Sequence, residues 1–124
     1  MSHARRNYLV TAAAGGIGGE LVGLLLDAGA GVFACDISGK RLAALEERAG
    51  VRRGNLAVLK VDVADEKGAS QAGHAAIERF GTVHGLANVA GGIAGIGEDI
   101  IDRPIERIAP DEYQQTVRLN LDSA

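Results

Sequence analysis

The stretch that decides the fold is Thr11-Ala-Ala-Ala-Gly15-Gly16-Ile17-Gly18. An apolar run at 8–11, expected to be the first strand, leads into it, and apolar residues at helical spacing follow it. Glycines let a backbone approach a phosphate closely, and the N–H groups and dipole of a helix N-terminus attract its negative charge. We therefore expect a pyrophosphate site here with Gly16 and Gly18 as contacts. A purely structural glycine turn is the alternative.

The segment after this loop has the pattern of an amphipathic helix over 17–28. Its apolar positions recur at helical spacing and predict one buried face made of Ile17, Leu21, Leu24, Leu25 and Ala28. Gly29 stands where a residue that ends a helix is expected.

Short apolar runs and helical segments then alternate to the end of the chain. Strands are expected at 31–35, 56–63 and 85–89, and helices after Ser38, between Asp65 and Gly81, and from near Asp111. Ser38 and Asp65 are the expected N-caps. Such alternation predicts an α/β fold with a doubly wound, Rossmann-like parallel sheet in the strand order 3-2-1-4.

Length and composition agree with one domain over 1–124. The chain has 124 residues and a formal net charge of −3, so a nucleic-acid surface is not expected. Its apolar runs are far shorter than the roughly 20 residues that cross a bilayer, so no membrane association is expected either. The single Cys35 has no partner for an internal disulfide, which favours a reducing, cytoplasmic location.

Asp36 follows the second apolar run by one position and the glycine loop by about 20 residues. At that spacing a carboxylate can accept hydrogen bonds from both hydroxyls of an adenosine ribose, which favours NAD. A 2′-phosphate would be repelled, and Ala12–Gly15 and Ile37 offer no Arg or Lys to offset the repulsion, so NADP is less expected. A solvated turn residue is the alternative for Asp36.

Four stretches, in order, resemble the short-chain dehydrogenase/reductase family over essentially the whole chain. Thr11–Gly18 resembles the family's T-G-x-x-x-G-x-G loop, with Ala12 in place of the first glycine. Asp62-Val63 resembles the segment that closes the third strand. The other two are Asn88-Val89-Ala90-Gly91, similar to N-N-A-G, and Val117–Leu121, similar to the helix that presents a catalytic Asn.

The resemblance implies a set of site residues. Asp62 and Val63 would approach the adenine, and Asn120 would be catalytic, positioning a water in a proton relay. A structural role for Asn88 in the sheet is an equal alternative. The implied cofactor-binding residues are Thr11, Gly16, Ile17, Gly18, Asp36, Asp62, Val63, Asn88, Ala90 and Gly91.

The function that this resemblance implies is that of an NAD-dependent oxidoreductase, which moves a hydride between nicotinamide and an alcohol or ketone. The family also uses a Ser and a Tyr-x-x-x-Lys motif, and neither Tyr8 nor Tyr113 has a Lys four residues on. We therefore expect a chain truncated before the second half of the fold and inactive by itself. A non-catalytic dinucleotide-binding module is the alternative.

Two further expectations concern partners and other cofactors. An apolar helix face near Tyr113, Val117 and Leu121 predicts a homo-oligomer. The histidines lack metal-ligand spacing, so no metal is expected. An S-adenosylmethionine site would also use a glycine loop and an acidic residue, but the stretches around Asn88 and Asn120 argue against it.

Overall fold

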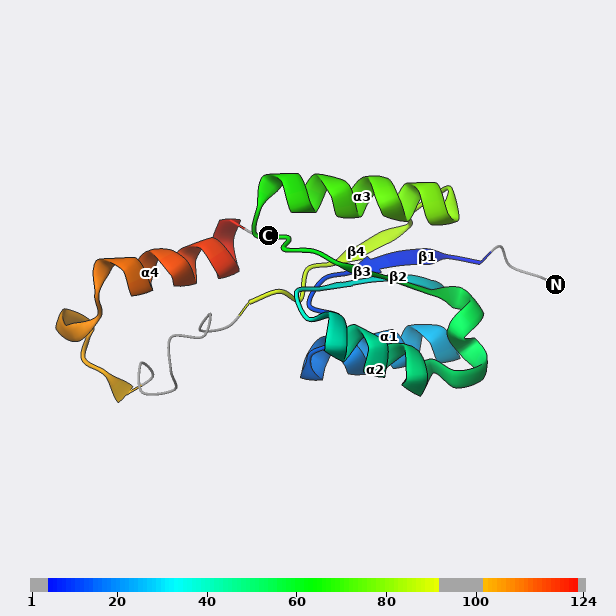
Figure 1. Ribbon diagram of the computed structural model, residues 1–124, viewed down its shortest axis with the longest axis horizontal. Coiled ribbons are helices and arrows are strands. Elements are labelled where there is room, and N and C mark those ends of the chain that lie inside the picture. The colour runs from blue at the N-terminus through cyan, green and yellow to red at the C-terminus, as the bar shows by residue number, and fades with distance from the viewer. Residues whose placement is uncertain (1–4, 92–101, 123–124) are drawn as a thin grey trace.

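The computed structural model describes residues 5–91 and 102–122. In this part of the chain four strands alternate with helices (Figure 1). The strands are β1 (Asn7–Val10), β2 (Gly31–Asp36), β3 (Leu56–Lys60) and β4 (Gly85–Ala87). The α-helices are α1 (Gly16–Asp27), α2 (Gly39–Ala49), α3 (Glu66–Phe80) and α4 (Pro110–Val117).

The strands form one parallel sheet in the order β3-β2-β1-β4. Val10 of β1 lies opposite Ala34 of β2 on one side and Ala87 of β4 on the other. The expected Rossmann-like class and strand order are therefore confirmed. In a parallel sheet all carboxyl ends lie at one edge, where ligands of such folds bind.

Helices cover both faces of the sheet. In Figure 1 α1 and α2 lie on one face and α3 on the other. Successive side chains of β2 point to opposite faces of the sheet and belong to two separate cores. Val32 and Ala34 pack toward α1 and α2. Phe33 and Cys35 pack toward α3. Every residue of β2 is buried, as expected for a central parallel strand.

The buried face of α1 differs from the expected one. Ile17 is 79% exposed and Leu24 is 66% exposed. The residues that α1 buries are Gly18, Gly19, Val22 and Leu26, while Leu21 and Leu25 are only partly buried. The apolar pattern misleads here because two residues without side chains lie on the buried face, where they let the helix approach the loop before it.

Two strands are shorter than expected. The chain leaves β3 at Lys60 rather than 63, since the Asp62 carboxylate accepts a hydrogen bond from the Ala64 N–H and forms a local turn. β4 ends at Ala87 rather than 89, because the Val89 and Ala90 N–H groups donate to the Thr11 hydroxyl instead of to a strand. A 3₁₀-helix over Gly50–Asn55 joins α2 to β3 and was not expected.

The helix ends agree with the sequence in most places. Ser38 caps α2 by accepting a hydrogen bond from the Arg41 N–H, as expected. Asp65 occupies the N-cap position of α3, as expected, but its side chain makes no capping hydrogen bond. The position was therefore predicted correctly and the capping bond was not. Gly29 and Gly81 follow α1 and α3 with φ of 84° and 80°, the left-handed conformation expected there. Among the described residues, no helix combines the length and apolar character needed to span a bilayer.

Candidate functional site

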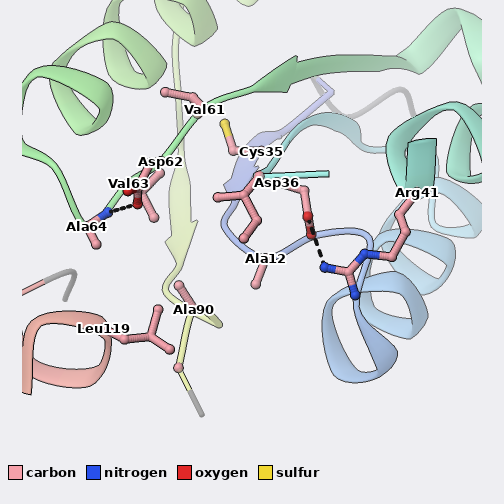
Figure 2. A pocket seen from close by; sticks show the side chains of 12 residues that line it. Ala12, Cys35, Asp36, Arg41, Val61, Asp62, Val63, Ala64, Ala90 and Leu119 are labelled. Carbon is pink, nitrogen blue, oxygen red and sulfur yellow. Dashed lines mark hydrogen bonds and ion pairs between the residues drawn. The ribbon is translucent and has the colours of Figure 1, made fainter. Parts of the chain in front are cut away.

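A pocket opens at the carboxyl ends of the strands (Figure 2). Its volume is about 560 Å³ including the open mouth. It is bounded by the glycine loop, the end of β2, the loop after β3, the segment after β4 and the C-terminal helical turn. The lining residues are Ala12, Cys35, Asp36, Ile37, Arg41, Val61, Asp62, Val63, Ala64, Ala90, Gly91 and Leu119.

The glycine loop turns sharply into α1. Ala12 has a φ of 48°, the left-handed conformation that glycine adopts most easily. Gly18 is buried under this turn, and a Cβ added to it would lie 2.1 Å from the Ala12 carbonyl oxygen. Gly16 is exposed, with nothing within 4 Å of an added Cβ. Gly18 therefore closes the loop onto the helix, and Gly16 faces open space.

The start of α1 can receive an anion. Its N-cap is Gly15, which has no side chain to cap the helix, and the first turn holds no acidic residue. The N–H groups of the first turn and the helix dipole therefore offer positive partial charge at the sheet edge. These N–H groups fit a pyrophosphate. Contact of Gly16, Ile17 or Gly18 with a pyrophosphate stays a prediction.

Thr11 connects β1 to the segment after β4. Its hydroxyl oxygen accepts hydrogen bonds from the Val89 N–H at 3.0 Å and the Ala90 N–H at 3.1 Å, and the residue is 4% exposed. The side chain therefore holds one wall of the pocket in place. Thr11 was expected among the cofactor-binding residues, but the structure gives its hydroxyl to the protein backbone.

Asp36 ends β2 and is 4% exposed, so it is not a solvated turn residue. Its Oδ2 accepts a hydrogen bond from the Ala14 N–H at 3.1 Å, and its Oδ1 accepts one from the Ser38 N–H at 2.9 Å. These bonds tie the glycine loop and the start of α2 to one carboxylate. A buried carboxylate held in this way is preorganised to accept further hydrogen bonds from a ligand in the pocket.

Arg41 is a charged pocket residue that was not identified from the sequence. Its guanidinium lies 3.3 Å from Asp36 Oδ1, and its side chain is 56% exposed (Figure 2). In the sequence a basic side chain was sought only in Ala12–Gly15 and Ile37, which hold none, and Arg41 was not considered. Ser38 starts α2, and Arg41, three residues later in the first turn, reaches back to the end of β2. The Ser38 N-cap, with Arg41 three residues after it, is the sequence feature from which this contact could have been predicted.

Asp62 and Val63 line the pocket from the loop after β3, not from a strand end. Asp62 Oδ1 accepts the Ala64 N–H at 3.0 Å, and Oδ2 lies 3.3 Å from the Arg118 guanidinium. Both side chains of this ion pair are about half exposed, at 50% and 55%. The pair is therefore a weak link between this loop and the C-terminal helical turn.

The segment after β4 supplies the opposite wall. Ala90 and Gly91 line the pocket, whereas Asn88 is exposed and is not among the lining residues. The structure thus brings Asp36, Asp62, Val63, Ala90 and Gly91 together. It leaves Thr11, Gly16, Ile17, Gly18 and Asn88 outside the pocket lining.

Asn120 lies in a π-helical turn, Arg118–Asp122, that continues α4. Its Nδ2 donates to the Thr116 carbonyl at 2.9 Å, and a Cβ added to Gly91 would lie 2.8 Å from its Oδ1. The amide is therefore beside the segment after β4, and the missing side chain at Gly91 makes room for it. π-helical turns are frequent at functional sites.

Cys35 lies at the base of the pocket and is fully buried. Burial raises the pKa of its thiol to about 12, and the neighbouring Asp36 carboxylate adds to this effect. The thiol is therefore protonated and unreactive at neutral pH. Across residues 5–91 and 102–122, no three His, Cys, Asp or Glu side chains are arranged to hold a metal ion.

The parallel sheet, the uncapped glycine loop and the buried acidic residue at the end of β2 define a nucleotide-binding α/β protein. The family model described as short chain dehydrogenase matches residues 6–124. The chain belongs to the short-chain dehydrogenase family, which binds NAD(P).

One curated relative is 2,3-dihydroxy-2,3-dihydro-p-cumate dehydrogenase from Pseudomonas putida, 38% identical over 114 residues. The match covers 91% of this chain and 41% of the relative, so the chain spans about two fifths of that protein's length. A solved short-chain dehydrogenase/reductase from Mycobacterium ulcerans is 28% identical, with a TM-score of 0.84 over 99% of this chain and 44% of the other.

A third protein shares the fold. The structure described as ElxO with NADP bound has a TM-score of 0.82 and 18% identity, covering 97% of this chain and 46% of that one. At this identity the likeness shows the fold alone.

Proposed function

We propose that this chain is the dinucleotide-binding part of an oxidoreductase that moves a hydride between nicotinamide and an alcohol or ketone. The observation that carries the proposal is Asp36, a buried carboxylate at the end of β2 that is anchored to the glycine loop. The relative from Pseudomonas putida is named for a dihydroxy compound, which supports an alcohol as the substrate class.

Each part of the site has a defined task in this proposal. The N–H groups of Gly16, Ile17 and Gly18 hold the pyrophosphate, and Asp36 accepts the hydroxyls of the adenosine ribose. Asp62 and Val63 border the adenine. Asn88, Ala90 and Gly91 lie on the side of the nicotinamide ribose. When bound, the nicotinamide accepts or donates the hydride.

Asn120 would act on the proton rather than on the hydride. In the proposal its side-chain amide holds a water molecule that takes part in proton transfer, and the bond from Nδ2 to Thr116 orients the amide. Measured in the whole protein, Asn120→Ala should then lower kcat while leaving dinucleotide affinity unchanged.

NAD is the proposed preferred cofactor, as the sequence predicts. Asp36 favours hydroxyls and disfavours a 2′-phosphate through like charge. Arg41 reduces this repulsion, because its guanidinium lies 3.3 Å from Asp36 Oδ1. The proposal is therefore preference for NAD with NADP still admitted.

Calorimetric titration of NAD into native protein, Asp36→Ala and Asp36→Asn tests the proposal. Hydrogen bonds to a charged group contribute about 1.5–3 kcal/mol, so each substitution should weaken NAD binding at least about tenfold. The Asn variant keeps the shape of the side chain and guards against a folding defect in the Ala variant. Unchanged affinity in both folded variants would contradict the role of Asp36.

The second candidate function is a non-catalytic dinucleotide-binding module. It needs only the glycine loop, the buried Asp36 and the pocket at the carboxyl edge, all of which lie within the described residues. Measured in the whole protein, binding of NAD without its reduction by any alcohol, together with weaker binding in Asp36→Ala, would support this candidate.

We also propose a homo-oligomer in the cytoplasm. The buried, unpaired Cys35 supports a reducing compartment. Tyr113 and Leu121 are large apolar side chains that are 65% and 70% exposed. Their exposure on one part of the chain supports association with a second subunit.

A further inference from the structure

We infer that Arg41 sets the discrimination between NAD and NADP, by competing with the ribose for Asp36 and by pairing with a 2′-phosphate. The inference rests on the proposed function. It assigns a specificity-determining role to a residue of α2 that lies outside the glycine loop and the end of β2.

The first step is a count of acceptor positions on Asp36. Each carboxylate oxygen can accept about two hydrogen bonds. Oδ1 accepts from the Ser38 N–H at 2.9 Å and from Arg41 at 3.3 Å, so both its positions are used. Oδ2 accepts only from the Ala14 N–H among the described residues. One position therefore remains, although a ribose presents two hydroxyls.

The second step asks which of the three bonds can yield. The Ala14 and Ser38 N–H groups belong to the backbone and stay where the fold puts them. Arg41 is held by a long side chain that is 56% exposed, and its only contact with Asp36 is a single bond of 3.3 Å. Arg41 is thus the displaceable partner, and NAD must displace it before Asp36 can accept both hydroxyls.

The third step concerns the 2′-phosphate. Arg41 lines the same pocket as Asp36 and Ile37, and its side chain is 56% exposed. Figure 2 shows its guanidinium beside the Asp36 carboxylate. A phosphate at the ribose 2′ position would displace a hydroxyl from Asp36 but would gain a charge-assisted bond to Arg41. The same side chain therefore opposes NAD slightly and favours NADP.

The test is calorimetric titration of NAD and NADP into native protein, Arg41→Ala, Arg41→Lys and Arg53→Ala at one ionic strength. Arg53 is the matched control, since it pairs with Glu46 at the same distance of 3.3 Å and is 63% exposed. It does not line the pocket. Circular dichroism checks that each variant is folded.

In Arg41→Ala, NADP affinity should fall about two- to fivefold, as for loss of one exposed ion pair, and NAD affinity should hold or rise up to about threefold. Arg41→Lys should keep part of the NADP affinity, because it keeps the charge but not the planar fork. Arg53→Ala should change both affinities equally or not at all.

Two outcomes overturn the inference and are distinguishable. If Arg41→Ala binds NAD and leaves the ratio of the two affinities as in native protein, Arg41 has no role in discrimination and the proposed function survives. If folded native protein binds neither dinucleotide, the proposed function fails and the inference fails with it.

Discussion

At the scale of single residues, Ala12 carries the clearest local strain in the described chain. It is the one non-glycine residue there with positive φ, at 48°. The left-handed conformation costs an alanine roughly 1–2 kcal/mol, whereas the extra freedom of an unfolded glycine costs about 0.4–1 kcal/mol. Ala12→Gly should therefore raise the free energy of unfolding by about 0.5–1 kcal/mol in urea denaturation.

The control for this substitution is Ala14→Gly in the same loop. Ala14 does not have positive φ, so glycine there should only lower stability, by about 0.4–1 kcal/mol. If both substitutions destabilise the protein alike, the backbone at Ala12 is not strained.

Cys35 gives the fold a dependence on alkaline pH. Because burial raises the folded pKa to about 12, the folded thiol keeps its proton where the unfolded thiol loses it. The contribution of the Cys35 thiol to the free energy of unfolding is therefore fully present below the unfolded pKa of about 8.5. It is lost as the pH rises toward 12. Native protein should thus lose about 1–2 kcal/mol more stability between pH 8 and pH 10 than Cys35→Ala. Parallel stability curves for the two proteins would contradict this.

At the scale of elements, the junction between the glycine loop and α1 contains one glycine that packing requires, Gly18, and one that is free to face a ligand, Gly16. Gly18→Ala would drive a Cβ into the Ala12 carbonyl and should lower the free energy of unfolding by about 1–3 kcal/mol. Gly16→Ala meets open space, and alanine is the better helix former by about 1 kcal/mol, so stability should hold or increase.

For Gly16→Ala, NAD affinity should fall although stability does not. A methyl group at this exposed position would stand between the backbone and a pyrophosphate, so Gly16→Ala should weaken NAD affinity while the protein stays folded. Thermal unfolding and calorimetric titration of both variants measure the two effects. Equal loss of stability in the two variants would show that the junction is not packed as described.

At the scale of the whole molecule, α4 and the turn after it lie beyond the carboxyl edge of the sheet (Figure 1). Ile105, Tyr113 and Leu121 in this part of the chain are 83%, 65% and 70% exposed. Burying such side chains contributes about 1.5–3 kcal/mol each, which supports self-association. Sedimentation at rising concentration should show dimers or larger species, and Tyr113→Glu should reduce them. Monomers at every concentration would contradict the proposed oligomer.

The sheet order, the alternation of strands and helices, and the position of Asp36 at the end of a buried strand were predictable from the sequence. These depend on local periodicity and on the short connections between neighbours in the chain, which sequence spacing records directly. The helix ends at Gly29 and Gly81 were also predictable, because glycine is favoured where the backbone has a positive φ.

The remaining features of the site depend on contacts between different segments of the chain. The tertiary structure shows that Arg41 reaches Asp36, that the Thr11 hydroxyl serves the Val89 and Ala90 N–H groups, and that α1 buries glycines rather than its largest apolar side chains. Each of these depends on which groups approach one another across the sheet edge. Hydropathy spacing carries no information on such contacts, because it records where a side chain faces along its own element and not which partner satisfies it.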